Sequence, residues 1–370
     1  MVAVLIALLA GMWAGLLRLG WAWPPLLLTL PANHGPLMIG GFLGALIGLE
    51  RAIGTGKRWA YAAPVLAGLG TLALFIDGSG QLAPALLTLS SAVLLAVLVT
   101  LYRLQPALFT GTLCLGGLSW LIGNALWWAG WSVPAVVLWW AGFLILTIAG
   151  ERLELSRLLR LSTFAQGSFL AATAILFIGM AASIGATLLT PGATHFGSAL
   201  HLRALHLSAR IAGLGMLALA AWLLHYDIAR RRLRAGGQAR YIGLCLLSGY
   251  VWLAAAGVMA LAFGGVRAGP HYDALLHAIF LGFVFSMVFG HAPIILPAVL
   301  RLPVAYTPAW YAPLILLHLS LLLRVVGDLL PWWPARLWGG LLNAVVLLLF
   351  LGTMAVSALR GRSAATRQPA

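Results

Sequence analysis

The sequence predicts an all-α membrane protein, a polytopic transmembrane helical bundle of about twelve spans. Hydrophobic residues make up 62% of the 370-residue chain and charged residues only 8%. Such a chain has too little polar surface to enclose its apolar residues in a water-soluble core. The apolar runs are also continuous and long enough to cross a bilayer, which excludes the alternating pattern of a transmembrane β-barrel.

Each expected span ends at a charged or polar loop, or at one that holds glycine or proline. In chain order the spans are expected at residues 2–18, 34–50, 59–77, 82–103, 107–129, 133–150, 163–190, 200–225, 240–264, 272–299, 308–328 and 337–359. The first run has no charged segment before it and no clear cleavage site, so we interpret it as a span and not as a signal peptide. The loops are short, and we expect residues 1–370 to form a single integral membrane domain.

The basic residues predict the orientation of the chain. Lysine and arginine gather in alternate loops, for example around Arg51, around Arg103 and at Arg230–Arg234, and the intervening loops hold few of them. Because cytoplasmic loops are enriched in basic residues, both termini are expected in the cytoplasm. The net charge of +15 is then explained by the basic cytoplasmic loops. The expected partner is therefore the lipid bilayer and not a nucleic acid.

Short similarities along the chain indicate a threefold pseudo-repeat of four helices. Spans two and six end alike, with GLERA (Gly48–Ala52) and GERLE (Gly150–Glu154). Spans two and ten begin alike, with His34 and His277 followed by small and apolar residues. Small residues also line span two, and tight helix packing is sufficient to explain them.

Histidines inside the spans are the candidate site residues, because an ionisable side chain in a membrane helix is costly and marks a functional site by default. His34, His277 and His206 each lie early in a span, at one expected depth. Neutral imidazole binds haem iron and copper, so these three could hold a metal within the membrane. In the alternative interpretation, each is a buried histidine bonded to a backbone carbonyl.

Further residues extend this candidate site. His291 follows His277 by fourteen residues, which on an ideal α-helix places both rings on one face about 21 Å apart. His318 lies near the middle of span eleven and could supply a second haem. Arg210 lies one turn from His206, where it could neutralise a haem propionate or pair with a carboxylate.

The acidic residues have plainer interpretations. Asp273 precedes His277 by four residues, where it could orient that ring or cap its helix, and the cap is favoured. Arg324 and Asp328 are expected to pair along one helix. Glu50 and Glu151 lie at inner helix ends, where they could begin a proton path, but pairing with Arg51 and Arg152 is favoured. No Walker loop, HExxH or GxSxG motif occurs, so a hydrolytic enzyme is not expected.

Two segments, HGPLMIGGFLGALIGLERA from His34 and DALLHAIFLGFVFSMVFGHAPII from Asp273, resemble the histidine-bearing helices of the NnrS family. These are twelve-span bacterial membrane proteins with haem and copper, associated with the response to nitric oxide. They are in turn similar to the haem-copper oxidase catalytic subunit. The resemblance implies that His34 and His277 are haem ligands and that His291 matches a further histidine.

The chain also departs from those patterns. It lacks the second histidine near His34 and the histidines that an oxidase-type copper centre requires, so oxygen reduction by this chain alone is not expected. We expect a bacterial inner-membrane protein that binds haem of the b type, with copper as a second candidate cofactor. It would act in nitric-oxide metabolism or electron transfer, with a gaseous or small-molecule ligand and a redox partner.

Two alternatives remain open at this point. The first is a metal-free transporter or channel for a small anionic or proton-coupled substrate, in which the same histidines and Arg210 line the pathway. The second is a structural or assembly factor in which the histidines only pack.

Overall fold

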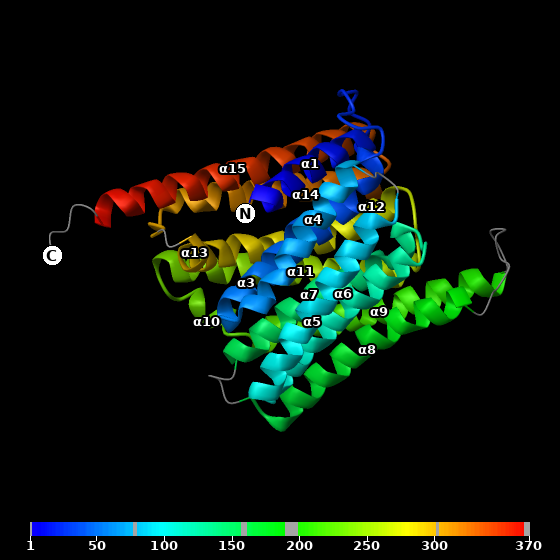
Figure 1. The fold of residues 1–370 in the computed structure, drawn as a ribbon, viewed down its shortest axis with the longest axis horizontal. Helices are drawn as coiled ribbons and strands as arrows, with labels where there is room; N and C mark the ends of the chain where they lie inside the picture. Colours follow the sequence, from blue (N-terminus) through cyan, green and yellow to red (C-terminus); the bar gives the residue numbers. More distant parts are fainter. Residues whose placement is uncertain (1, 77–79, 157–160, 189–198, 301–302, 366–370) are drawn as a thin grey trace. The chain divides into compact units, whose positions relative to one another are not determined.

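The computed structural model describes residues 2–76, 80–156, 161–188, 199–300 and 303–365. These residues form helices and no strand (Figure 1). Within them, twelve helices are long and apolar enough to cross a membrane. The predicted fold class, an all-α polytopic membrane protein, is therefore confirmed.

The chain divides into two compact units, Met1–Glu151 and Arg152–Ala370. The first unit contains α1 (Val2–Leu19), η1 (Leu30–Asn33), α2 (His34–Pro36), η2 (Leu37–Gly44), α3 (Ala45–Thr55), η3 (Arg58–Tyr61), α4 (Ala62–Ile76), α5 (Leu82–Leu104), α6 (Leu108–Trp128) and most of α7 (Val133–Ser156). In this unit α4 packs on α5, α5 packs on α6, and α1 packs on η2.

The second unit follows the boundary inside α7. It contains α8 (Thr163–Leu188), α9 (Ala199–Tyr226), α10 (Ala229–Arg232), α11 (Gly237–Phe263), α12 (Pro270–His277), η5 (Ala278–Phe285), α13 (Ser286–Leu300), η6 (Pro308–Trp310), α14 (Tyr311–Leu329) and α15 (Trp333–Ala365). Helix α9 packs between α8 and α11, and α14 pairs with α15 (Figure 1).

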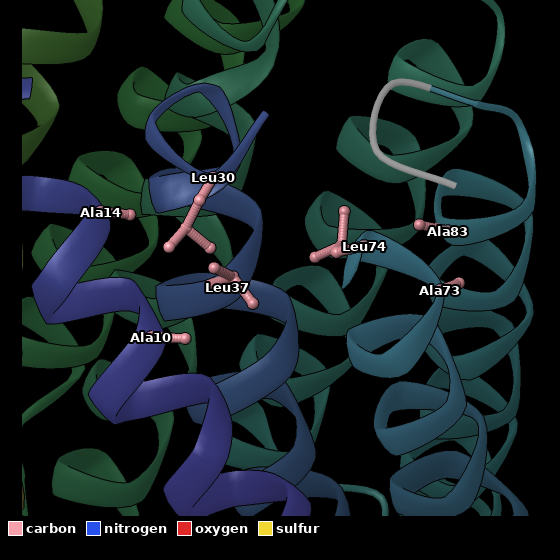
Figure 2. Packing of buried hydrophobic residues seen from close by; sticks show 7 residues of the cluster. All are labelled: Ala10, Ala14, Leu30, Leu37, Ala73, Leu74 and Ala83. Atoms are coloured by element: carbon pink, nitrogen blue, oxygen red, sulfur yellow. The ribbon is translucent and has the colours of Figure 1, made fainter. Parts of the chain in front are cut away.

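Small side chains allow the helices to approach closely. Figure 2 shows a buried cluster of the first unit, to which α1, the segment from η1 to η2, α4 and α5 contribute: Ala10, Ala14, Leu30, Leu37, Ala73, Leu74 and Ala83. In the second unit Gly179 of α8 faces the backbone of Ala212 in α9. Close backbone approach through small residues is the usual basis of helix association in a bilayer.

Spans two and ten differ from a continuous α-helix. Each contains an eight-residue π-helix, η2 (Leu37–Gly44) and η5 (Ala278–Phe285). We predicted that His277 and His291 share one face of an uninterrupted α-helix. Because η5 lies between them, that α-helix is not present. Because η5 bonds i to i+5, its turns hold more residues, and the rotation between the two rings no longer follows the α-helical count.

The two π-helices are a further similarity between spans two and ten. Each begins within three residues of the histidine that opens its span, His34 or His277. The likeness of spans two and ten, proposed from sequence, therefore extends to their backbone. The threefold repeat of four helices and the single domain over residues 1–370 stay predictions.

Candidate functional site: the histidine-bearing spans

His34 is positioned by two glycines of helix α1. Its Nδ1 lies 2.7 Å from the carbonyl oxygen of Gly11. A carbonyl only accepts, so Nδ1 carries the proton and donates. One turn along α1, Gly15 makes room for the ring, since a Cβ at that position would lie 2.8 Å from Cε1 of His34. Gly11 and Gly15 thus fix both the tautomer and the place of this imidazole.

His277 is held in the same way by its own helix. Its Nδ1 lies 2.8 Å from the backbone carbonyl oxygen of Asp273 and 3.3 Å from Oδ1 of that residue. The Asp273 carboxylate in turn accepts two hydrogen bonds from Arg324, at 2.9 and 3.0 Å. The predicted role of Asp273 in orienting the ring therefore has a direct structural basis.

Two expectations about the nearby charges are wrong. Helix α12 is capped by the backbone of Gly269, so Asp273 is not its N-cap. Arg324 pairs with Asp273, and Asp328 lies 2.8 Å from Nε of Arg336. Arg324 and Asp328 therefore do not form the predicted pair along α14, because α12 and α15 supply better placed partners.

His291 shares the tautomer of the first two histidines. Its Nδ1 donates to the carbonyl oxygen of Met287 at 2.9 Å. In a neutral ring this leaves the lone pair on Nε2. His34, His277 and His291 thus each have the bond to a backbone carbonyl that the alternative interpretation, a packing histidine, predicts. The same bond is usual in metal-ligating histidine, because it leaves the Nε2 lone pair for the metal.

His206 and His318 have the opposite tautomer. Nδ1 of His206 accepts from the backbone N–H of Gly265 at 3.2 Å. Nδ1 of His318 accepts from the indole N–H of Trp252 at 3.1 Å. Both donors can only donate, so the proton of each neutral ring is on Nε2. Neither ring offers an Nε2 lone pair, which disfavours ligation by that atom.

The remaining predicted residues are dispersed. Arg210 is exposed on α9 and forms no ion pair within the part of the chain that the structure describes. His34 belongs to the first unit, and His277, His291, His318, His206 and Arg210 belong to the second. Among the described residues, no group of three or more His, Cys, Asp or Glu side chains is close enough to hold a metal ion. A shared site of His34 and His277 stays a prediction.

The basic end of the second unit holds a buried ion pair that sequence reasoning missed. Arg152 donates to both carboxylate oxygens of Asp227, at 2.7 and 3.0 Å. The same carboxylate accepts from the Tyr250 hydroxyl at 3.1 Å and from the Ala229 N–H at 2.6 Å. All four bonds are buried, and together they satisfy the carboxylate oxygens.

In the first unit, Arg51 pairs with Glu151. The expected pairing is confirmed for Arg51 and Glu151, but Arg152 binds Asp227 in place of the expected glutamate. The pair of Arg51 and Glu151 also joins the ends of α3 and α7, where the two similar motifs GLERA and GERLE lie. Their likeness is therefore accompanied by a direct contact.

The chain matches a family described as a domain of unknown function, DUF8744, over residues 1–359. It belongs to that family. No curated protein and no solved structure matches the chain. The DUF8744 match includes both histidine-bearing spans and the ion-paired arginines Arg51, Arg152, Arg324 and Arg336.

Two features of this DUF8744 chain had only weak signals in its sequence. The π-helices follow no motif, although glycines occur in both, at Gly40, Gly41 and Gly44 and at Gly282. The partner of Arg152 lies seventy-five residues away, a separation that a single sequence does not reveal. An arginine at a span end was visible, but the positive-inside rule already accounted for it.

Proposed function

We propose that this chain is a haem-binding membrane protein, with His34 and His277 as its iron ligands. One observation carries the proposal. Each ring donates its Nδ1–H to a backbone carbonyl, and an eight-residue π-helix begins within three residues after each histidine. No other histidine among the described residues combines these two features.

Both features are expected of a ligand-bearing helix. Donation from Nδ1 fixes the ring orientation and raises the basicity of Nε2 toward a metal. π-Helical turns are rare and are frequently found at functional sites. Bound haem would supply reversible iron redox chemistry and a position for a diatomic ligand. His291 has the same tautomer and is the third candidate ligand.

The wider proposal places the protein in the bacterial inner membrane with both termini in the cytoplasm. There it would act in nitric-oxide metabolism or electron transfer, with a gaseous ligand and a redox partner. Copper is the second proposed cofactor. Arg210 is the proposed counter-ion for a haem propionate, and its lack of an ion-paired carboxylate among the described residues is compatible with that role.

An absorption spectrum of the purified protein from haem-replete cells tests the proposal. We expect a Soret band that is lost in His34→Ala and His277→Ala. His318→Ala should keep the band, because its Nε2 carries the proton. Circular dichroism and thermal unfolding confirm that each variant folds. A folded, colourless wild-type protein, or equal loss of the band in all three variants, contradicts the proposal.

A metal-free transporter is the second candidate, and one observation favours it. Asp273, Arg324, Asp328 and Arg336 form a linked set of charges on α12, α14 and α15, within or next to membrane spans. Such groups often mark a pathway for ions or protons. Uptake of a small anion by proteoliposomes containing the colourless protein, lost in Arg336→Gln, would support this function over the first.

A further inference from the structure

A basic pocket lies beyond the C-terminal end of helix α9, at the arginine-rich segment that follows it. It has a volume of about 820 Å³ and is lined by Arg230, Arg231 and Arg234, together with Asp227 and His225 among others. These arginines belong to α10 and the residues that follow it, between α9 and α11. Arg230, Arg231 and Arg234 are exposed, so their guanidinium groups are available to an anion.

The one carboxylate in this pocket does not cancel their charge. Asp227 already pairs with the buried Arg152, which does not line the pocket. The pKa of the adjacent Arg232 guanidinium is lowered, first by burial and then by the charge of Arg152, while Asp227 and Tyr250 act in the opposite direction. An anionic group in the pocket would therefore be attracted by three arginines.

The arginines are held in place by the fold. The Asp227 carboxylate accepts from the N–H of Ala229 at the start of α10. Helix α10 also packs directly on α11, where a Cβ at Gly243 would lie 3.0 Å from the Ala229 carbonyl oxygen and 3.1 Å from Cβ of Arg232. Because the backbone of α10 is anchored at both places, Arg230 and Arg231 project from a packed helix and not from a flexible basic tail.

A second pocket extends from the first along the membrane helices. It has a volume of about 620 Å³ and shares His225, Arg230 and Leu233 with the basic pocket. Its other lining residues are mainly aliphatic: Ala221, Leu224, Leu247 and Val251. Ser248 also lines it, but its hydroxyl donates to the Leu244 carbonyl at 2.8 Å. The Ser248 hydroxyl therefore needs no hydrogen bond from a ligand.

We propose that these adjoining pockets bind one anionic phospholipid, with the phosphate against Arg230, Arg231 and Arg234 and an acyl chain in the aliphatic pocket. Basic pockets between transmembrane helices are suited to anionic headgroups. A soluble phosphate would use only the basic pocket and would leave the aliphatic pocket unexplained. Arginines that serve topology alone would need neither pocket. The proposal is independent of haem binding.

Native mass spectrometry of the detergent-purified full chain tests this site. The protein is mixed with dioleoylphosphatidylglycerol or dioleoylphosphatidylcholine, and the bound lipid is counted. We expect selective retention of phosphatidylglycerol. Each arginine near the surface contributes enough to change affinity about fivefold, so the triple variant Arg230→Gln/Arg231→Gln/Arg234→Gln should bind about a hundredfold more weakly.

The matched control removes equal charge from the first unit, at exposed residues of other basic loops: Lys57→Gln/Arg58→Gln/Arg103→Gln. It should leave phosphatidylglycerol binding unchanged. Thermal unfolding of all variants checks that they fold. Equal retention of the two lipids, or equal loss in the two triple variants, overturns the proposal.

Two further measurements distinguish a lipid from a free anion. Ala221→Phe, at an exposed position of α9, fills the aliphatic pocket and should reduce phosphatidylglycerol binding while Arg230 remains. Millimolar inorganic phosphate should not displace the lipid. If phosphate displaces it and Ala221→Phe has no effect, the pocket binds a free anion and the lipid assignment is wrong.

Discussion

Replacing Gly15 by alanine is expected to displace the His34 ring. The new Cβ would lie 2.8 Å from Cε1 of His34, and ordinary van der Waals contact begins at 3.4 Å. The ring must therefore move by about 0.6 Å. A shift of that size away from α1 lengthens its 2.7 Å bond to the Gly11 carbonyl to about 3.3 Å, beyond the usual N–H···O range.

The expected changes follow from these distances. Overpacking of this kind costs about 1–3 kcal/mol, and the weakened hydrogen bond adds about 1 kcal/mol. The better helix propensity of alanine offsets about 0.5–1 kcal/mol. Unfolding should therefore require about 1–3 kcal/mol less free energy. If His34 ligates haem, loss of its orienting bond should also weaken haem binding by about tenfold or more.

Gly68→Ala is the matched control for this substitution. Gly68 also lies inside a helix of the first unit, but its Cβ would meet only Ala3 at an ordinary 3.4 Å. Thermal unfolding in detergent and haem content per protein should be measured for both variants. If Gly15→Ala unfolds at the same temperature as Gly68→Ala and retains the same haem content, the inferred position of the His34 ring is wrong.

Three further substitutions test other parts of the structure. Asp227→Ala leaves the buried Arg152 without its carboxylate, so the free energy of unfolding measured by denaturant titration should fall by about 3–5 kcal/mol; a loss below about 1 kcal/mol would contradict the buried pairing. Trp252→Phe removes the donor to His318, and the Soret maximum should stay unchanged, whereas a shift would indicate that His318 ligates iron. Asn124→Ala removes two buried hydrogen bonds, which should lower the free energy of unfolding by about 1–3 kcal/mol, and no change in the thermal midpoint would argue against both bonds.

Packing against neighbouring helices holds the two π-helices in place. An α-helix cannot change to i→i+5 bonding without strain and poorer packing, so such segments persist where surrounding contacts hold them. In the first unit Gly40 and Gly41 of η2 lie against Leu87 and Thr71. In the second, Gly282 of η5 lies against Trp252, the residue that also bonds His318. Close packing thus supports both segments, independently of any cofactor.

The sequence determined the features that depend on local composition. The length and hydropathy of each apolar run were enough to predict twelve spans, because a bilayer of fixed thickness accepts helices of limited length. The positions of His34 and His277 inside those spans also made them candidate residues without a structure. The free-energy cost of a histidine in the bilayer depends on its position within an apolar run, and a single sequence shows that position.

Only the tertiary structure decided which ring nitrogen of His34 and of His318 carries the proton. His34 donates because Gly11 presents a carbonyl from another helix, whereas His318 accepts because Trp252 presents an indole N–H. Likewise, Arg152 found its partner in Asp227. Hydrogen bonds and buried charges are governed by atoms within about 3 Å, and segments distant in sequence supply those atoms. A pattern of residues along the chain therefore could not determine them.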